Sequence, residues 1–492
     1  MKSNDPPAAP STFVVVGGGT SAILLTIRLL ESNQNVILLE RGAKQGYSSS
    51  SCTGTFYTDP ANWPAAAHRS ASRHSSMPLS TLGNRTILFP QGALGLGGTS
   101  NINAMIWSAG HRSVYDRHWP SPWSSAAVDS LLRSAVSILE PRVVEATPLA
   151  RLLLGQHPCR GADVADSPED PLYFESAKFS GRCAHFATVS RTTGKRLDLG
   201  LLLRSSTGEG KGTLTVLPHC EARRIEFEVS ADGTRRATAV RCNTTDSPEL
   251  QAYLAKEGSK STAGGKDSRQ ELDVRPSGEN GEIVLCAGVF ESPRILLDSP
   301  GLDGVAAAKE IGAQLQDHIC LPIMGFYNWW APRKRGDSVQ YPMNCIHGWV
   351  YLDAEGEALA PGSTELPCVQ LLVVDGRCSP AYMLPEIALP RFSAGENAGV
   401  LSRGCIFFYA CLLRPFLATV MFLLLLLPPF RAAAGCVFGV LVSNVQPHSR
   451  GKLVRGAGNS PLEIHCNFLG DKDGHDKRES NPNPTSTPNP TI

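Results

Sequence analysis

The sequence has no excess of charge of either sign. Its 492 residues include 46 Lys and Arg against 45 Asp and Glu, which gives a formal net charge of +1. Nucleic-acid-binding proteins usually carry a basic surface, so this balance argues against a nucleic-acid partner and favours a small-molecule ligand. We expect no metal site, because the 14 cysteines contain no CxxC pair and no zinc-type spacing.

The first residues also lack the apolar stretch of a secretory signal. The segment MKSNDPPAAPSTF has one lysine and three prolines but no run of apolar residues. We therefore expect a protein that is not secreted and is cytoplasmic or membrane-associated. The scattered cysteines are then expected to be buried or free thiols of a reducing compartment.

From Phe13 onward the sequence shows a strand–turn–helix–strand pattern. FVVV is apolar and β-branched, GGGTSA is a turn, ILLTIRLLES is a helix, and NVILLE is a second strand that ends at Glu40. This unit is typical of one half of a doubly wound fold. The predicted fold class is therefore α/β, with a Rossmann-like nucleotide-binding domain.

The turn carries a GxGxxA motif made by Gly17, Gly19 and Ala22. In such a motif the first glycine permits the tight turn, the second lets the backbone approach a pyrophosphate, and the small third residue allows close helix packing. Glu40 follows about 20 residues later, where a carboxylate can accept hydrogen bonds from a ribose. The motif predicts dinucleotide binding without distinguishing FAD from NAD, and the alternative is a glycine-rich turn with no ligand.

A second glycine-rich segment narrows the choice of cofactor. Residues 96–103 read LGGTSNIN, and Trp107, Gly110 and Asp116 follow. This pattern resembles the first signature of the glucose–methanol–choline (GMC) oxidoreductases, although Leu94 stands where that family usually has a basic residue. The resemblance implies FAD, with this loop against the flavin. Members with covalent FAD often carry His at the position of Ile102, so noncovalent binding is implied.

Further segments follow the order of the same family. Residues 218–222 resemble the strand end whose backbone reaches the adenine, and 287–297 resemble the second signature with departures at Val289 and Pro300. Three shorter elements, at 314–318, 447–451 and 467–471, extend the resemblance from Phe13 to about Asp476. The residues expected to bind FAD are Gly17, Gly18, Gly19, Thr20, Ser21, Glu40, Leu96, Gly98, Thr99, Asn103, Ala104, Met105, Ile106 and Ala222.

The expected architecture is a discontinuous FAD-binding domain beside an α+β substrate domain on a mixed or antiparallel sheet. Strands are predicted at 214–217, 224–228 and 237–241 as neighbours in one sheet, and a helix is predicted from Ser292. The FAD-binding domain is assigned 10–120, 205–245 and 280–320; the substrate domain 121–204 and 321–470; a solvated insertion 256–280; and a disordered tail 477–492.

The resemblance implies oxidation of a CH–OH donor, in which hydride passes to the flavin and a histidine near the C-terminus takes the hydroxyl proton. The expected partner is thus a small alcohol. No histidine here matches that base, so no catalytic residue is predicted. The chain is either a truncated product of a working enzyme or a flavin-binding protein without alcohol oxidation; a light-driven flavin enzyme is a third possibility. The oligomeric state stays open.

One long apolar segment stands apart from these motifs. Residues 405–430 read CIFFYACLLRPFLATVMFLLLLLPPF, flanked by Arg403 and Arg431. About 20 apolar residues suffice to cross a bilayer, but Arg414-Pro415 interrupts the run and two prolines end it. Two interpretations remain: a domain or membrane-surface helix, which is favoured, or a transmembrane span.

Overall fold

The structure is a computed structural model. The structure describes residues 9–42, 77–79, 85–87, 95–103, 105–107, 109–110, 112–144, 181–182, 185–187, 196–256, 270–302, 305–326, 346–352, 369–375, 405, 407–425, 427, 429–430, 437–455, 462–468 and 470.

A four-stranded parallel sheet in the order β13-β1-β2-β9 organises the first part of the chain. Helix α1 connects β1 to β2, so the predicted strand–helix–strand unit and the α/β fold class are confirmed. The sheet and its connecting helix comprise β1 (Thr12–Val16), α1 (Thr20–Glu31), β2 (Asn35–Leu39), β9 (Leu214–Leu217) and β13 (Ile283–Leu285).

Alternate residues of the parallel strands build two separate cores. Val14 and Val16 face one core, while Val15 packs in the other with Ile23 and Leu30 of α1. Successive side chains of a strand point to opposite faces, so a continuous apolar strand needs cover on both sides. Besides α1, the helices that contribute to these two cores are α5 (Ser125–Leu139), α7 (Leu199–Ser205), α8 (Pro248–Lys256) and α9 (Gly288–Leu297).

The face toward α8 and α9 is also covered by an antiparallel sheet in the order β10-β11-β12. Its strands are β10 (Cys220–Val229), β11 (Arg235–Thr244) and β12 (Gln270–Val274). The expectation that 214–217 shares a sheet with the next two strands is therefore wrong, because β9 pairs with β2 instead. Strand propensity is local and does not carry the identity of the pairing partner.

The segment expected to be a solvated insertion at 256–280 contains part of this core. β12 pairs with β11, and Val274 is fully buried. Two apolar residues, Leu272 and Val274, alternate on one face of a strand that is otherwise polar, a pattern too short to stand out among its charged neighbours. Residues 257–269 and the expected tail 477–492 lie outside the described residues.

Three helices also differ from expectation. Helix α9 begins at Gly288 rather than at Ser292, so Pro293 lies inside the helix. Helices α5 and α7, expected in the substrate domain, pack on the parallel sheet through Leu139 and Leu203. Both helices lie almost entirely within 121–204, the range assigned to the substrate domain, yet their apolar residues belong to a core of the parallel sheet.

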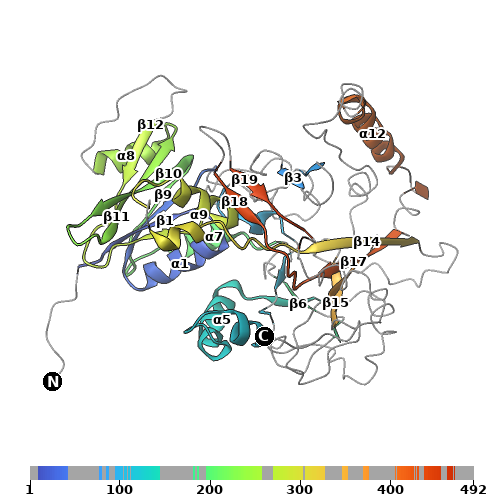
Figure 1. The fold of residues 1–492 in the computed structure, drawn as a ribbon, viewed down its shortest axis with the longest axis horizontal. Coiled ribbons are helices and arrows are strands. Elements are labelled where there is room, and N and C mark those ends of the chain that lie inside the picture. Colours follow the sequence, from blue (N-terminus) through green and yellow to red (C-terminus); the bar gives the residue numbers. More distant parts are fainter. Residues whose placement is uncertain are drawn as a thin grey trace.

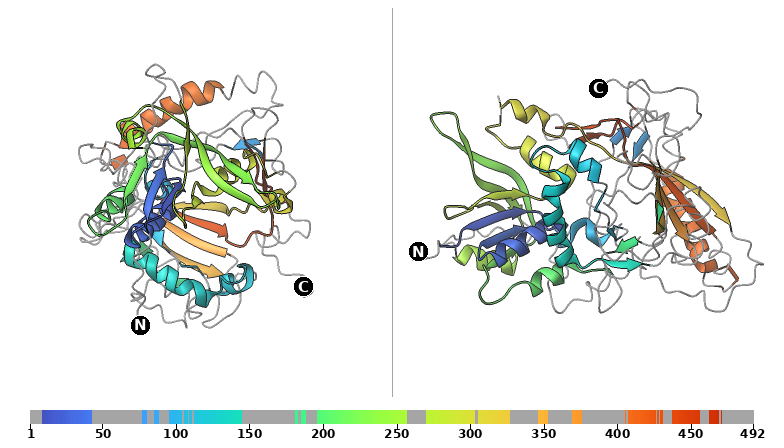
Figure 2. Two further views of the ribbon diagram at one scale, coloured as in Figure 1. Left: turned by 90° about the vertical axis from the view of Figure 1, so that its left-hand side faces the viewer. Right: turned by 90° about the horizontal axis from the view of Figure 1, so that it is seen from below.

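The second large sheet is antiparallel, with five strands in the order β14-β17-β16-β15-β7. Figures 1 and 2 show it at the opposite end of the molecule from the parallel sheet. Its strands are β7 (Gly181–Arg182), β14 (Ile319–Phe326), β15 (Ile346–Leu352), β16 (Val369–Asp375) and β17 (Val437–Asn444).

Shorter elements complete the described chain. They are β3 (Met77–Leu79), β4 (Arg85–Ile87), η2 (Gly98–Asn101), β5 (Ile106–Trp107), α4 (Arg112–His118), β6 (Arg142–Val144), β8 (His185–Ala187), η4 (Ala306–Glu310), η5 (Tyr409–Leu413), α12 (Arg414–Leu425), β18 (Lys452–Val454) and β19 (Glu463–His465).

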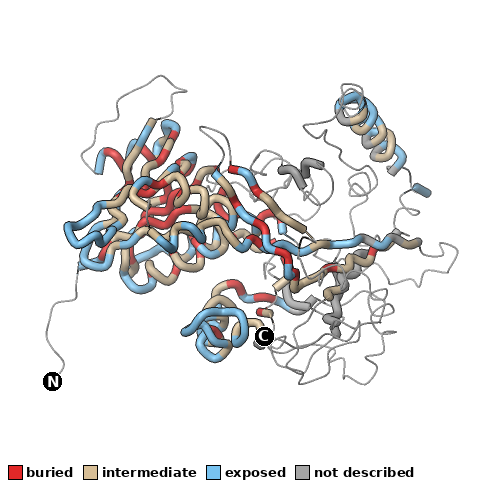
Figure 3. The backbone as a smooth tube through the Cα atoms, in the orientation of Figure 1, coloured by how far each residue is buried: buried red, intermediate tan, exposed pale blue. Residues whose placement is uncertain are grey.

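The apolar segment forms a π-helical turn, η5, followed by α12. Across the described residues, no helix has both the length and the apolar character needed to cross a membrane. Figure 1 shows α12 away from both large sheets, and Figure 3 shows its surface as exposed or intermediate. Phe407, Phe416 and Leu423 are 68%, 64% and 55% exposed, so a large apolar surface lies open on this segment.

Candidate functional site

A cavity of about 320 Å³ lies where β1 and β2 end, the edge at which doubly wound sheets bind their ligands. This volume is within the usual range of small-molecule sites. The walls come from segments that are far apart in sequence: residues 16–19, 39–41, 98–99, 220–222, 286–291, 294 and 295.

The floor of the cavity is the start of helix α1. Gly19 is the N-cap residue, no side chain among the described residues caps this end, and the first turn has no acidic residue. A Cβ atom added to Gly19 would meet nothing within 4 Å. The first turn of α1, which has no side-chain cap, and the positive end of its helix dipole therefore lie at this open space, which is the arrangement that binds a phosphate group.

The other glycines of the two loops are needed for packing. Gly17 has φ +100°, and a Cβ atom there would lie 2.6 Å from the carbonyl oxygen of Cys286. A Cβ atom on Gly98, at φ +51°, would lie 2.9 Å from the Cα of Gly19. The turn and the 96–103 loop thus touch backbone to backbone, and only glycine allows this approach.

The carboxylate of Glu40 joins these loops. It is 6% exposed and accepts three backbone hydrogen bonds: from Gly18 N at 2.8 Å to Oε2, and from Gly42 N at 2.6 Å and Gly95 N at 2.9 Å to Oε1. A carboxylate offers about four acceptor positions. Glu40 therefore holds the turn in place and keeps one position for a ligand hydroxyl.

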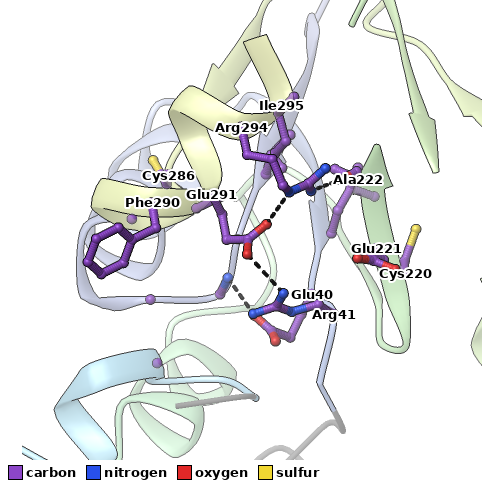
Figure 4. A pocket seen from close by; sticks show the side chains of 18 of the residues that line it. Glu40, Arg41, Cys220, Glu221, Ala222, Cys286, Phe290, Glu291, Arg294 and Ile295 are labelled. Atoms are coloured by element: carbon purple, nitrogen blue, oxygen red, sulfur yellow. Dashed lines mark hydrogen bonds and ion pairs between the residues drawn. The ribbon is translucent and has the colours of Figure 1, made fainter. Parts of the chain in front are cut away.

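An ionic chain starts beside Glu40 and runs from Arg41 through Glu291 to Arg294, as Figure 4 shows. Arg41 lies 3.1 Å from Glu291, which lies 2.6 Å from Arg294. Arg294 also donates to the carbonyl oxygen of Ala222 at 2.7 Å. Burial lowers the pKa of Arg294, but the carboxylates of Glu291 and Asp298 outweigh it and raise that pKa, so the guanidinium stays charged.

The predicted residues divide into three groups. Gly17, Gly18, Gly19, Glu40, Gly98, Thr99 and Ala222 line the cavity. Thr20 and Ser21 begin α1 beside it, and Leu96 is 2% exposed behind Gly18. Asn103, Met105 and Ile106 are outside the lining and continue from the turn that carries Thr99, and Ala104 lies outside the described residues.

Sequence reasoning missed several charged residues of the site. Arg41, Glu291 and Arg294 line the cavity. Arg41 directly follows Glu40, and the other two belong to the second signature. Their positions within these motifs could have predicted that they line the cavity. Arg196 is 2% exposed and bonds to Ser100 and Asn103, yet it stands in a polar GKR run that gave no signal of burial.

Comparison with known proteins links the chain to one family through its first 320 residues. The family model described as GMC oxidoreductase matches residues 11–320. An oxygen-dependent choline dehydrogenase of Sinorhizobium medicae is 26% identical over 338 residues, covering 62% of this chain and 52% of the relative. A chloroplastic fatty acid photodecarboxylase of Chlamydomonas reinhardtii is 23% identical over 333 residues, covering 62% and 48%. The chain spans about half the length of these relatives.

Solved structures agree on the fold. A pyridoxine 4-oxidase from Mesorbium loti has a TM-score of 0.55 at 18% identity, covering 96% of this chain and 79% of the other. A formate oxidase has a TM-score of 0.57 at 16% identity, covering 96% and 80%.

Proposed function

The chain belongs to the GMC oxidoreductase family, and we propose that it binds FAD noncovalently and oxidises the CH–OH group of a small alcohol. One observation carries the proposal: the uncapped start of α1 opens at Gly19 into a cavity built from the family's motifs. FAD is the cofactor of this family, and its diphosphate matches that cradle.

Each wall of the cavity has a role toward such a cofactor. The first turn of α1 would bind the diphosphate, and the remaining acceptor position of Glu40 would take a ribose hydroxyl. The backbone at Ala222, fixed by Arg294, would face the adenine. The 96–103 loop would then approach the ring system. FAD, when bound, supplies the hydride acceptor that the protein's own side chains lack.

Noncovalent binding is supported by the residue at the position where covalent members often carry His. Ile102 is 9% exposed and has no nucleophilic atom. Burial also raises the pKa of the Cys286 thiol, which lines the cavity, so this sulfur stays protonated and poorly nucleophilic.

We assign no catalytic base. The structure describes seven histidines: His118, His185, His219, His318, His347, His448 and His465. None of the seven lines the cavity. Cofactor binding and alcohol oxidation are therefore tested by separate measurements.

The first test is spectroscopic. We expect the purified chain, mixed with FAD and freed of excess, to show a flavin absorption band, and acid precipitation to release all flavin into the supernatant. Anaerobic addition of primary alcohols, choline included, should then bleach the band. Retention of flavin by the precipitate would overturn noncovalent binding. Bound FAD that no alcohol bleaches would favour a flavin-binding protein without alcohol oxidation, and failure to bind FAD would overturn the proposal.

We also propose that the segment of η5 and α12 contacts an anionic membrane surface. Its large apolar side chains are exposed, as shown above, and no Asp or Glu occurs between residues 397 and 462. The same stretch contains Arg403, Arg414 and Arg431. Exposed apolar side chains with basic neighbours are the features by which a surface helix binds anionic lipid.

Vesicle sedimentation tests this contact. We expect the protein to pellet with vesicles containing phosphatidylglycerol and less with phosphatidylcholine alone. The double variant Phe416→Asp/Leu423→Asp should stay in the supernatant, whereas Leu201→Asp, an exposed leucine on α7, should behave as wild type. If the double variant pelleted with the anionic vesicles as much as the wild-type protein does, the proposal would be overturned. If the wild-type protein did not bind vesicles but self-associated, and the double variant did not self-associate, the surface would be assigned to contact with a second copy of the chain.

A further inference from the structure

Arg196 is a buried cation beside the loop that follows the cavity wall. It is 2% exposed, and no carboxylate among the described residues forms an ion pair with it. Its Nε atom is buried without a hydrogen-bond partner there. Burial lowers the pKa of Arg196 to about 10, so the side chain remains charged at neutral pH. Buried arginines are usually paired, so this one requires an explanation.

Two of the three hydrogen bonds that Arg196 donates go to Asn103. Arg196 Nη1 donates to Asn103 Oδ1 at 2.7 Å and to Ser100 O at 2.6 Å, and Nη2 donates to Asn103 O at 2.7 Å. The Asn103 backbone N–H donates to Thr99 O at 2.9 Å, so Asn103 lies one turn beyond a residue of the cavity wall. The guanidinium thus holds both the backbone and the side chain of Asn103.

These contacts fix which way the Asn103 amide points. Its Oδ1 atom accepts from Arg196 and also from the backbone N–H of Met105 at 3.0 Å. Both neighbours can only donate, so the oxygen must face them and the NH₂ group must point away. Met105 has φ +62° and is fully buried, a strained backbone that this bond helps to hold.

We propose that Arg196 is a positioning residue that orients Asn103 so that its NH₂ group donates to an acceptor atom on the flavin ring. The inference rests on the proposed function, since it needs a bound flavin. Asn103 is exposed, so its NH₂ group is open to a ligand. The ring offers carbonyl oxygens and an unprotonated nitrogen as acceptors. The uncompensated charge of Arg196 also favours the extra electron density of the reduced ring.

The sharpest test is Asn103→Asp. The new carboxylate can still accept from Arg196 and Met105, so the fold should hold, but it has no N–H to donate. We expect FAD to bind about tenfold more weakly, the visible flavin band to shift, and the midpoint potential to become more negative. Unchanged affinity, band and potential in a folded variant would overturn the proposal.

Substitutions at Arg196 separate positioning from simple folding. Arg196→Met should weaken FAD binding and alter the flavin band. Arg196→Lys keeps the charge but loses the planar fork, so it should recover only part of the wild-type FAD affinity and only part of the wild-type flavin band. A lower melting temperature in both variants with a wild-type flavin band and potential would show a purely structural role and overturn the proposal. Failure of the wild-type protein to bind FAD would instead count against the proposed function.

Discussion

Replacing Gly19 with valine is expected to abolish FAD binding while leaving the fold intact. Gly19 has φ −75° and ψ −178°, an extended conformation that valine adopts readily, and nothing lies within 4 Å of the added Cβ. The side chain would fill the space above the start of α1, where the diphosphate is expected. Loss of two or more charge-assisted hydrogen bonds corresponds to at least about hundredfold weaker binding.

Gly208→Val is the matched control, because a Cβ atom at Gly208 also meets nothing within 4 Å and the residue is not part of the cavity wall. FAD titration followed by flavin fluorescence would measure both affinities, and circular dichroism would check the folds. We expect Gly208→Val to match wild type. If folded Gly19→Val bound FAD as tightly as the control, the diphosphate could not lie on this helix end.

The parts of the site that sequence predicts best are those where one residue type is sterically required. Gly17 and Gly98 both have positive φ and close backbone neighbours, so glycine is the only residue that fits. Such positions leave a fixed spacing in the sequence, which is why the turn, α1 and the approach of the second loop could be anticipated. The apolar run of β1 was equally visible, since both faces of a parallel strand are buried.

The parts that sequence does not predict depend on partners far along the chain. The residues of β12 were expected to belong to a solvated insertion, because their own composition is mostly polar. Their burial depends on pairing with β11. Arg196 gave no signal because a basic residue in a polar run is usually exposed. Its burial follows from backbone carbonyls 93 and 96 residues away, which no local pattern encodes.

Replacing Glu40 with alanine is expected to cause the largest loss of stability. Its carboxylate satisfies three backbone N–H groups of the turn and the neighbouring loops, and the site is 6% exposed. Alanine would leave these donors without acceptors, at about 1–3 kcal/mol for each one that water does not reach. We expect the free energy of unfolding to fall by about 3–5 kcal/mol, a large share of the stability of an ordinary domain.

Glu31→Ala is the control for Glu40→Ala, since it removes a carboxylate whose partner is a surface arginine. Glu31 lies 2.6 Å from Arg28, with the two side chains 39% and 41% exposed, and such pairs contribute at most about 1 kcal/mol. Glu40→Gln should fall between the two, because its one remaining oxygen can keep two of the three N–H groups while its NH₂ group meets the third. Urea unfolding followed by circular dichroism would rank the variants. Equal midpoints for Glu40→Ala and Glu31→Ala would contradict the view that Glu40 holds the two loops together, and would leave ribose binding as its only role.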